Sequence, residues 1–211
     1  MINESNNIPI SEGVKGVDEI VNQKTLYIIA GCNGAGKTTA SYTILPQILD
    51  CHEFVNADEI ARGISPFNPS SVSTIAGKIM LKRIDELLES NMTFAIETTL
   101  ASKLFTKTVL KARDKGYITV LLFFWIESIE IAKSRVAQRV KAGGHHIPDD
   151  VIERRYRSGI RNLFDLYYPI VDIINIYDNT HELELIAQKH KHIDIINQKK
   201  YIDLGLIYGK M

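Results

Sequence analysis

The sequence predicts an α/β protein in which helices cover both faces of a mostly parallel central sheet. Two observations predict this class: short apolar runs alternate with amphipathic stretches, and the first of these runs leads directly into a glycine-rich turn. The composition is that of a globular protein, with 45% hydrophobic and 24% charged residues among 211. This length fits one domain, which we place at residues 25–211, with an N-terminal arm at residues 1–24 and a C-terminal appendage at about residues 180–211.

The expected strands are short runs rich in Ile, Val, Phe and Tyr, as is typical of strands that are buried on both faces. They cover residues 25–30, 53–56, 92–97, 117–125 and 171–177. After Asn179 the pattern changes, and residues 183–187 and 192–196 predict a small antiparallel hairpin.

The expected helices have apolar side chains at three- and four-residue steps. They cover residues 70–90, 128–141 and about 150–168. The first has one apolar stripe, and Asn68 and Pro69 supply a cap and a first-turn proline at its start.

Charge and cysteine content exclude several classes of protein. The 25 Lys and Arg residues balance the 25 Asp and Glu residues, whereas a dedicated nucleic-acid binder carries a positive surplus, so we do not expect nucleic acid as a partner. Cys32 and Cys51 match neither a zinc site nor a disulfide framework. The start of the chain lacks the apolar core of a signal peptide, and the longest uncharged apolar run, residues 117–126, is half of what a membrane helix needs. We therefore expect a cytoplasmic protein that does not enter a membrane.

The glycine-rich turn after the first strand is a phosphate-binding loop of the Walker A type. Gly31-Cys-Asn-Gly-Ala-Gly-Lys-Thr-Thr39 has the pattern G-x-x-x-x-G-K-[ST] between an apolar strand and an expected helix at residues 38–45. The backbone N–H groups and the positive end of the helix form a concave anion site for ATP. Lys37 is expected to reach the β- and γ-phosphates, and the Thr38 hydroxyl to ligate Mg²⁺. The predicted nucleotide-binding residues are Gly31, Asn33, Gly34, Ala35, Gly36, Lys37, Thr38 and Thr39.

Cys32 within this loop admits two interpretations. A thiol near a helix N-terminus can have a lowered pKa and respond to oxidants. The alternative, a small residue at a tolerant position of the motif, is the one we favour.

Among proteins with this loop, the sequence fits the kinases that act on small molecules or nucleotides. It has neither the N-K-x-D motif of GTPases nor the L-S-G-G signature of ABC ATPases, and Trp125-Ile-Glu127 is a poor match to the acidic strand end of AAA machines. The prediction is a P-loop nucleotide-kinase-like three-layer sandwich with an arginine-rich helical lid.

Two acidic residues follow expected strands and should face the same edge of the sheet. Asp58, in Asn56-Ala-Asp-Glu59, is our choice for the base that receives the proton of an acceptor hydroxyl, the alternative being a cap of a short helix at residues 59–62. Glu97 has three interpretations: a ligand of a substrate hydroxyl, a water-mediated contact to Mg²⁺, or a buried structural carboxylate.

The lid is expected between residues 133 and 161, where eight Lys and Arg against three Asp and Glu give a local charge of +5. The two expected helices of this segment are joined by the Gly143-Gly-His-His-Ile-Pro148 connection. Arginines brought over a γ-phosphate stabilise the charge that spreads in the transition state. Arg139, Arg154 and Arg155 are the candidates, and we assign Arg139 and Arg154.

Taken together, these motifs resemble the zeta toxin family, and more closely its chromosomal branch of predicted ATPases. The motifs that carry the resemblance are residues 31–39, 56–62 with 65–69, 94–100, 139–158 and 177–179. The resemblance implies a nucleotide-kinase-like fold and ATP-dependent phosphorylation of a small metabolite such as UDP-N-acetylglucosamine. It also implies a small helical antitoxin as partner.

By position in the motifs, the resemblance implies that Lys37 is the phosphate-loop lysine, that Asp58 is the catalytic aspartate, and that Glu97 and Thr98 contact the substrate. The lid arginines do not transfer by position, because the lid carries the Gly-Gly-His-His-Ile-Pro insertion; one family position falls near His145. Two other functions remain open: a regulatory ATPase without a small acceptor, and a kinase of nucleic-acid ends.

Overall fold

The structure, a computed structural model, describes residues 23–144 and 146–209. The predicted arm at residues 1–24 lies outside the described residues except for its last two positions. His145 and the last two residues of the predicted appendage also lie outside them.

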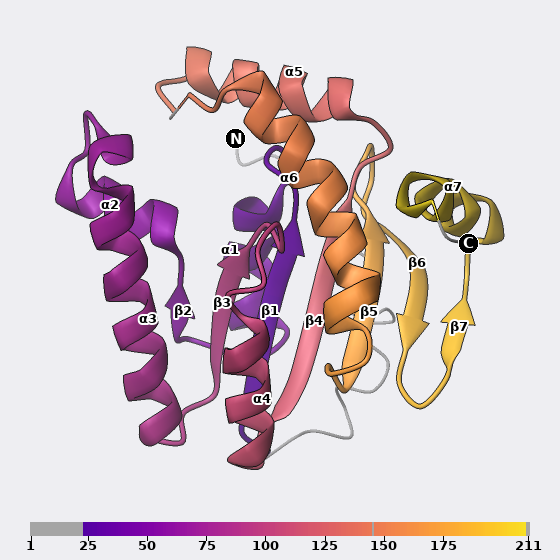
Figure 1. Cartoon of the computed structure of the whole chain (residues 1–211), viewed down its shortest axis with the longest axis horizontal. Coiled ribbons are helices and arrows are strands. Elements are labelled where there is room, and N and C mark those ends of the chain that lie inside the picture. The colour runs from indigo at the N-terminus through magenta and orange to yellow at the C-terminus, as the bar shows by residue number, and fades with distance from the viewer. Residues whose placement is uncertain (1–22, 145, 210–211) are drawn as a thin grey trace, which may run out of the picture.

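A single seven-stranded sheet forms the centre of the molecule, in the order β2-β3-β1-β4-β5-β6-β7 (Figure 1). The five parallel strands confirm the predicted ones, with ends shifted by at most two residues; they are β1 (Thr25–Gly31), β2 (Phe54–Val55), β3 (Phe94–Thr98), β4 (Ile118–Trp125) and β5 (Ile173–Asp178). The predicted hairpin is present as β6 (Glu184–Lys189) and β7 (Ile193–Ile195). It extends the same sheet in antiparallel fashion.

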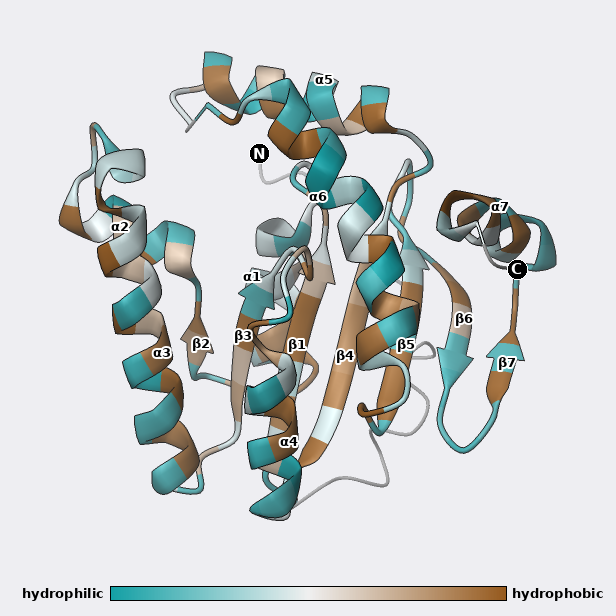
Figure 2. Ribbon diagram, viewed as in Figure 1, coloured by the Kyte–Doolittle hydropathy of each residue, from teal (hydrophilic) through white to brown (hydrophobic). Residues whose placement is uncertain are grey.

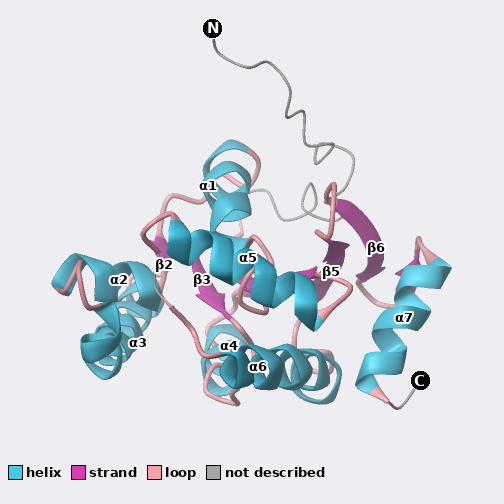
Figure 3. Ribbon diagram, turned by 90° about the horizontal axis from the view of Figure 1, so that it is seen from above, coloured by secondary structure: helices cyan, strands magenta, loops and turns pink. Residues whose placement is uncertain are grey.

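Helices cover both faces of this sheet, which confirms the predicted three-layer α/β architecture. Seen from above, α1 (Lys37–Gln47) lies on one face, and α4 (Thr106–Asp114) and α6 (Asp149–Asn162) lie on the other (Figure 3). Helix α5 (Ile129–Lys141) crosses over the carboxyl ends of the strands, and the α5–α6 pair forms the predicted helical lid. The β2 edge is flanked by α2 (Ala57–Ile64) and α3 (Ser73–Glu89), and the opposite edge by α7 (Gln198–Tyr208).

The two central strands are the most apolar part of the molecule (Figure 2). All of β1 is buried, and so is β4 from Thr119 onward. Each buried Leu or Ile contributes about 1.5–3 kcal/mol relative to an exposed one, so this pair of strands is a rigid support. The last residue of β1 is Gly31, where a Cβ atom would lie 2.2 Å from the carbonyl oxygen of Phe124. Only glycine therefore lets the chain leave the sheet here and enter the phosphate-binding loop.

The predicted helix over residues 70–90 divides into two elements. A 3₁₀ turn, η2 (Pro69–Val72), precedes α3, and Asn68 makes no side-chain cap to its backbone. Only part of the expected apolar stripe is buried, because α3 packs at the sheet edge; Ile75 and Ile79 are 52% and 42% exposed.

Helices α4 and α7 were not predicted, and the predicted helix at residues 150–168 ends in a π-helical turn, η3 (Leu163–Tyr167). In α4 only Val109 and Ala112 are buried, and in α7 only Leu204 and Gly205. Two buried positions do not make a recognisable helical pattern in a sequence.

Candidate active site

The phosphate-binding loop, residues 32–36, connects β1 to α1 at the carboxyl end of the sheet. Gly36 has φ +81° where α1 begins, and a Cβ atom there would lie 2.4 Å from Asn179 Nδ2. The Lys37 side chain is 7% exposed and its Nζ donates to the carbonyl oxygen of Cys32 at 3.0 Å, so its ammonium group lies along the loop. The loop and the first turn of α1 contain seven of the eight predicted nucleotide-binding residues, and the eighth, Gly31, is the last residue of β1 directly before the loop.

Side chains from distant elements hold this loop in shape. Asn179 Nδ2 donates to the carbonyl oxygen of Ala35 at 2.8 Å. The Arg135 guanidinium, from α5, donates to the carbonyl oxygens of Gly34 (3.3 Å), Asn179 (2.9 Å) and Thr180 (2.6 Å). Arg135 belongs to the basic segment between residues 133 and 161, but its donors bind backbone carbonyls of the loop and of the segment after β5. Arg135 therefore has a structural contact that holds the shape of the phosphate-binding loop.

Glu97, at the end of β3, points toward the phosphate-binding loop. Its Oε2 accepts hydrogen bonds from Thr38 Oγ1 at 2.8 Å and from Asn56 Nδ2 at 2.9 Å, and its Oε1 lies 3.7 Å from Lys37 Nζ. The side chain is 10% exposed. These contacts arise because β3 is the direct neighbour of β1 in the sheet. The carboxylate therefore contacts the hydroxyl group predicted to ligate Mg²⁺.

Asp58 occupies the first turn of α2, and the residue that caps this helix is Asn56. Asn56 Oδ1 accepts from the backbone N–H of Asp58 at 2.8 Å and of Glu59 at 3.4 Å. The alternative that Asp58 is the cap is therefore wrong, and the helix begins at Ala57 rather than at residue 59. The pattern Asn-x-x-Glu from 56 to 59 is a capping-box signal that identifies Asn56 from sequence. The Asp58 carboxylate is exposed and makes no hydrogen bond to the described residues.

Asp58 and Arg139 line the same small pocket, with a volume of about 80 Å³, between the start of α2 and the end of α5. The walls also carry hydroxyl and guanidinium groups. The complete lining is Ala57, Asp58, Ala61, Arg62, Pro69, Ser70, Ser73 and Arg139. Such a set of polar groups is suited to bind a hydroxylated or anionic ligand next to Asp58.

Among the lid arginines, Arg155 contacts the phosphate-binding loop. Its Nη1 donates to Asn33 Oδ1 at 3.1 Å from α6. Burial lowers the pKa of Arg155, the nearby Arg154 acts in the same direction, and the charge of Asp58 opposes them. Arg155 thus lies within the electrostatic reach of Asp58 as well as on the loop. The neighbouring Arg154 is exposed.

Two further residues have surroundings that bear on their predicted roles. Thr98 Oγ1 accepts from the backbone N–H of Leu100 at 3.1 Å, within the turn that follows β3.

Cys32 is 6% exposed, and burial raises the pKa of its thiol to about 11, against the opposing effects of Lys37 and Arg135. The environment of Cys32 therefore favours the interpretation as a small packed residue over a reactive thiol.

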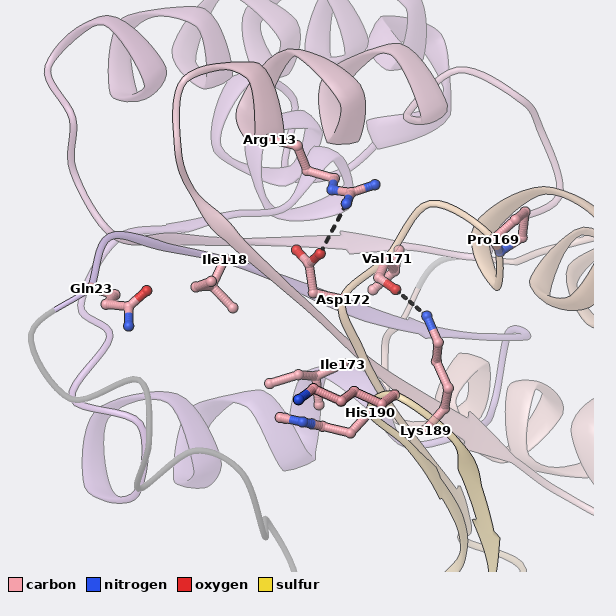
Figure 4. A pocket seen from close by; sticks show the side chains of 10 residues that line it. Gln23, Arg113, Ile118, Pro169, Val171, Asp172, Ile173, Lys189 and His190 are labelled. Carbon is pink, nitrogen blue, oxygen red and sulfur yellow. Dashed lines mark hydrogen bonds and ion pairs between the residues drawn. The ribbon is translucent and has the colours of Figure 1, made fainter.

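Another cavity, of about 400 Å³, lies at the opposite end of the strands (Figure 4). Charged groups that line this cavity bind other groups of the protein: Arg113 pairs with Asp172 at 3.3 Å, and Lys189 Nζ donates to the carbonyl oxygen of Val171 at 2.5 Å. Parallel α/β sheets bind ligands at the carboxyl ends of their strands, so the phosphate-loop edge is the functional one.

Residues 23–144 and 146–209 contain no group of three His, Cys, Asp or Glu side chains arranged to hold a metal ion. Among the helices of these same residues, none combines the length and the apolar character needed to cross a membrane.

Comparisons with known proteins bear on the family and the fold of this chain. An uncharacterized protein of Haemophilus influenzae is 28% identical over 136 residues, which are 64% of this chain and 95% of that protein. A chain of the AvrRxo1-ORF1:-ORF2 complex, crystallised with ATP, matches with a TM-score of 0.71 and 16% identity over 90% of this chain; the match spans 66% of that chain.

A chain of the PezAT chromosomal toxin–antitoxin system of Streptococcus pneumoniae matches with a TM-score of 0.64 and 15% identity, over 100% of this chain and 91% of that one. These likenesses confirm the predicted fold. The family model described as Zeta toxin matches residues 14–191. Because this match covers most of the chain and includes the phosphate-binding loop, Asp58, Glu97 and the lid, the protein belongs to the zeta toxin family.

Proposed function

We propose that the protein is a kinase that transfers the γ-phosphate of ATP to a hydroxyl group of a small acceptor. The observation that carries this proposal is the position of Asp58, which two separate connections link to the nucleotide-binding residues. Asp58 is bonded through Asn56 to Glu97 and so to Thr38. It interacts electrostatically with Arg155, which contacts Asn33. It also lines a pocket with Arg139.

The loop residues fit a bound triphosphate. Gly31 directly before the loop and Gly36 at its end are positions where a Cβ atom would collide with its neighbours. Backbone N–H groups of such a loop, at the start of a helix, bind phosphate oxygens. Lys37 would exchange its bond to Cys32 for the β- and γ-phosphates. Thr38 and, through water, Glu97 would hold Mg²⁺, which when bound supplies charge neutralisation on the β- and γ-phosphates.

The acceptor hydroxyl would enter beside Asp58. Its oxygen attacks the γ-phosphorus while its proton passes to the Asp58 carboxylate, and the bond from phosphorus to the β-phosphate oxygen breaks to release ADP. Arg155 and Arg139, from the two lid helices, would stabilise the negative charge on the transferring group. Arg154 would add positive charge at the outer face of the lid.

The identity of the acceptor rests on family membership and pocket chemistry. The hydroxyl and guanidinium groups around Asp58 suit an acceptor that carries several hydroxyls or an anionic group. UDP-N-acetylglucosamine is therefore the first acceptor to test, and Glu97 and Thr98 are the substrate contacts that the family resemblance implies. The PezAT system pairs a toxin with an antitoxin. On that basis we also propose a small antitoxin protein as a partner of this chain.

The test is transfer from [γ-³²P]ATP in the presence of Mg²⁺ to separate panels of UDP-sugars, nucleosides and oligonucleotides. We expect a labelled small-molecule product that is absent with Lys37→Ala, because that variant loses the phosphate-contacting ammonium group. Release of inorganic phosphate without any labelled acceptor would instead indicate a regulatory ATPase. A labelled oligonucleotide would indicate a kinase of nucleic-acid ends. Either result would overturn the proposal.

A further inference from the structure

The geometry points to Asn56 as a positioning residue. It fixes helix α2, which carries Asp58, relative to Glu97, the carboxylate proposed to contact Mg²⁺ through water. The inference rests on the proposed kinase activity and goes beyond it, because the motifs give Asn56 no role of its own. Asn56 lies between β2 and α2 and is 6% exposed.

Both ends of the Asn56 amide are engaged, each with a different part of the site. Its oxygen accepts from the backbone N–H groups of Asp58 and Glu59, and its nitrogen donates to Glu97 at 2.9 Å. Since Glu97 also accepts from Thr38, an unbroken path of hydrogen bonds runs from the first turn of α1, directly after the phosphate-binding loop, to the backbone of the proposed base.

This path matters because it joins the start of α2 directly to the metal-binding side of the site. Strand β2 has two residues and forms the edge of the sheet, where it pairs with Ala95 and Ile96 of β3. The helix itself packs against α3, which also lies at the edge. These contacts hold α2 against the sheet edge, whereas the bond to Glu97 sets the position of its first turn relative to Thr38. A displacement of about 1 Å in a reacting group can cost on the order of 10²-fold in rate.

Helix capping alone does not explain why the residue is asparagine. Ser, Thr and Asp cap helices about as well as Asn does. Of these four side chains, only that of Asn has one atom that accepts hydrogen bonds, the amide oxygen, and a second atom that donates them, the amide nitrogen. An aspartate would keep the cap but would place a second carboxylate against Glu97, and a serine would keep the cap with a shorter side chain.

The chain offers a matched control in Asn197. Asn197 caps α7 by accepting from the backbone N–H of Lys200 at 3.1 Å, and its nitrogen donates to Glu184 at 2.7 Å. Asn56 and Asn197 therefore make the same pair of contacts, a cap and a bond to a glutamate, but Asn197 lies far from the phosphate-binding loop along the sheet.

The first measurement compares N56D, N56S and N197D in kcat and in the KM for ATP, for transfer to the acceptor found with the wild type. We expect N56D and N56S to lower kcat by roughly 10–100-fold with little change in the KM for ATP. N197D should match the wild type in kcat and in the KM for ATP. If N56D and N56S match it too, the positioning role is overturned.

The second measurement does not need an acceptor. Hydrogen exchange of residues 57–64 is followed with and without Mg²⁺ and a non-hydrolysable ATP analogue. In the wild type and N197D the nucleotide should slow exchange in the first turn of α2, whereas in N56S, which keeps the cap, that effect should be lost. Equal slowing in all three proteins would contradict the inference. A wild type that shows the slowing but phosphorylates no acceptor would remove the proposed function and leave the Asn56 link in place.

Discussion

Two acidic side chains meet at the phosphate-loop edge, and their surroundings give them different capacities. Glu97 is 10% exposed, and its oxygens are occupied by Thr38, Asn56 and Lys37. A carboxylate held by several donors is suited to fix the positions of its partners. Asp58 is exposed at the start of a helix and makes no side-chain hydrogen bond to the described residues, so it is the one that can accept a proton from a ligand.

The two cysteines give a prediction about single residues. Burial raises the pKa of Cys32 to about 11 and that of Cys51 to about 12. A raised pKa lowers the thiolate fraction, so at pH 8 only about one Cys32 thiol in a thousand is ionised. We expect neither thiol to react quickly with DTNB in the folded protein, and both to react after unfolding in guanidinium chloride. A rapidly reacting thiol that ATP protects would show that Cys32 is accessible and activated.

Among single residues, those of the site that are contiguous in the sequence could be predicted, whereas those that only the fold brings into contact could not. The phosphate-binding residues are contiguous, so their motif could be recognised directly. The residues that hold or approach the loop are distant in the chain: Arg135 is 101 residues from Gly34, Arg155 is 122 from Asn33, and Asn179 is 144 from Ala35. No spacing rule predicts such pairs, which is why Arg155 could be named as a candidate but not distinguished from Arg154.

Among the elements, α7 is attached to the sheet by an ionic cluster. Lys200 Nζ lies 2.5 Å from Asp178 Oδ2 and 2.7 Å from Glu184 Oε2. Asp178 is 2% exposed, and Thr180 also donates to it. The hydrogen bond from Lys200 lowers the pKa of Glu184, and the bonds to Asp178 and Glu184 raise that of Lys200. The cluster contributes to stability at neutral pH, where all three groups are charged.

Replacing Lys200 by methionine should therefore lower the free energy of unfolding by roughly 1–3 kcal/mol, because the buried Asp178 loses its counter-ion. Urea unfolding at pH 7 measures this effect. The difference from the wild type should shrink as the pH falls through the lowered pKa of Glu184, below the usual 4.5, since the Glu184 carboxyl group then becomes neutral and no longer attracts Lys200. Lys199→Met, on the exposed neighbouring position, should change the free energy by less than about 0.5 kcal/mol. Equal effects of the two substitutions would exclude the cluster as the anchor of α7.

The strands were easier to predict than the helices for a physical reason. A strand buried on both faces, such as β4, is a continuous apolar run that stands out in any sequence. Helices α4 and α7 each bury only two residues, and their other residues are half-buried or exposed. Their stability comes from contacts such as the Lys200 cluster, which local sequence does not reveal.

For the whole molecule, three groups of elements converge at the carboxyl edge of the sheet (Figure 1). Strand β1 leads into the phosphate-binding loop, β3 carries Glu97, α2 next to the β2 edge carries Asp58, and the lid helices α5 and α6 carry Arg139 and Arg155. In the proposed kinase, binding of ATP and transfer of its phosphate would depend on different elements, and separate substitutions should divide them.

The most direct test of this division compares Asp58→Asn with Lys37→Ala in two assays: the thermal shift produced by Mg²⁺ and ATP, and the rate of transfer to the acceptor. A ligand at 100 times its Kd stabilises a folded protein by about 2.7 kcal/mol. We expect Asp58→Asn to keep the wild-type thermal shift while transfer falls by about 10²–10⁴-fold, as for loss of a general base. Lys37→Ala should lose both. Wild-type transfer by Asp58→Asn, or loss of its ATP-dependent shift, would contradict the assignment of Asp58 as the base.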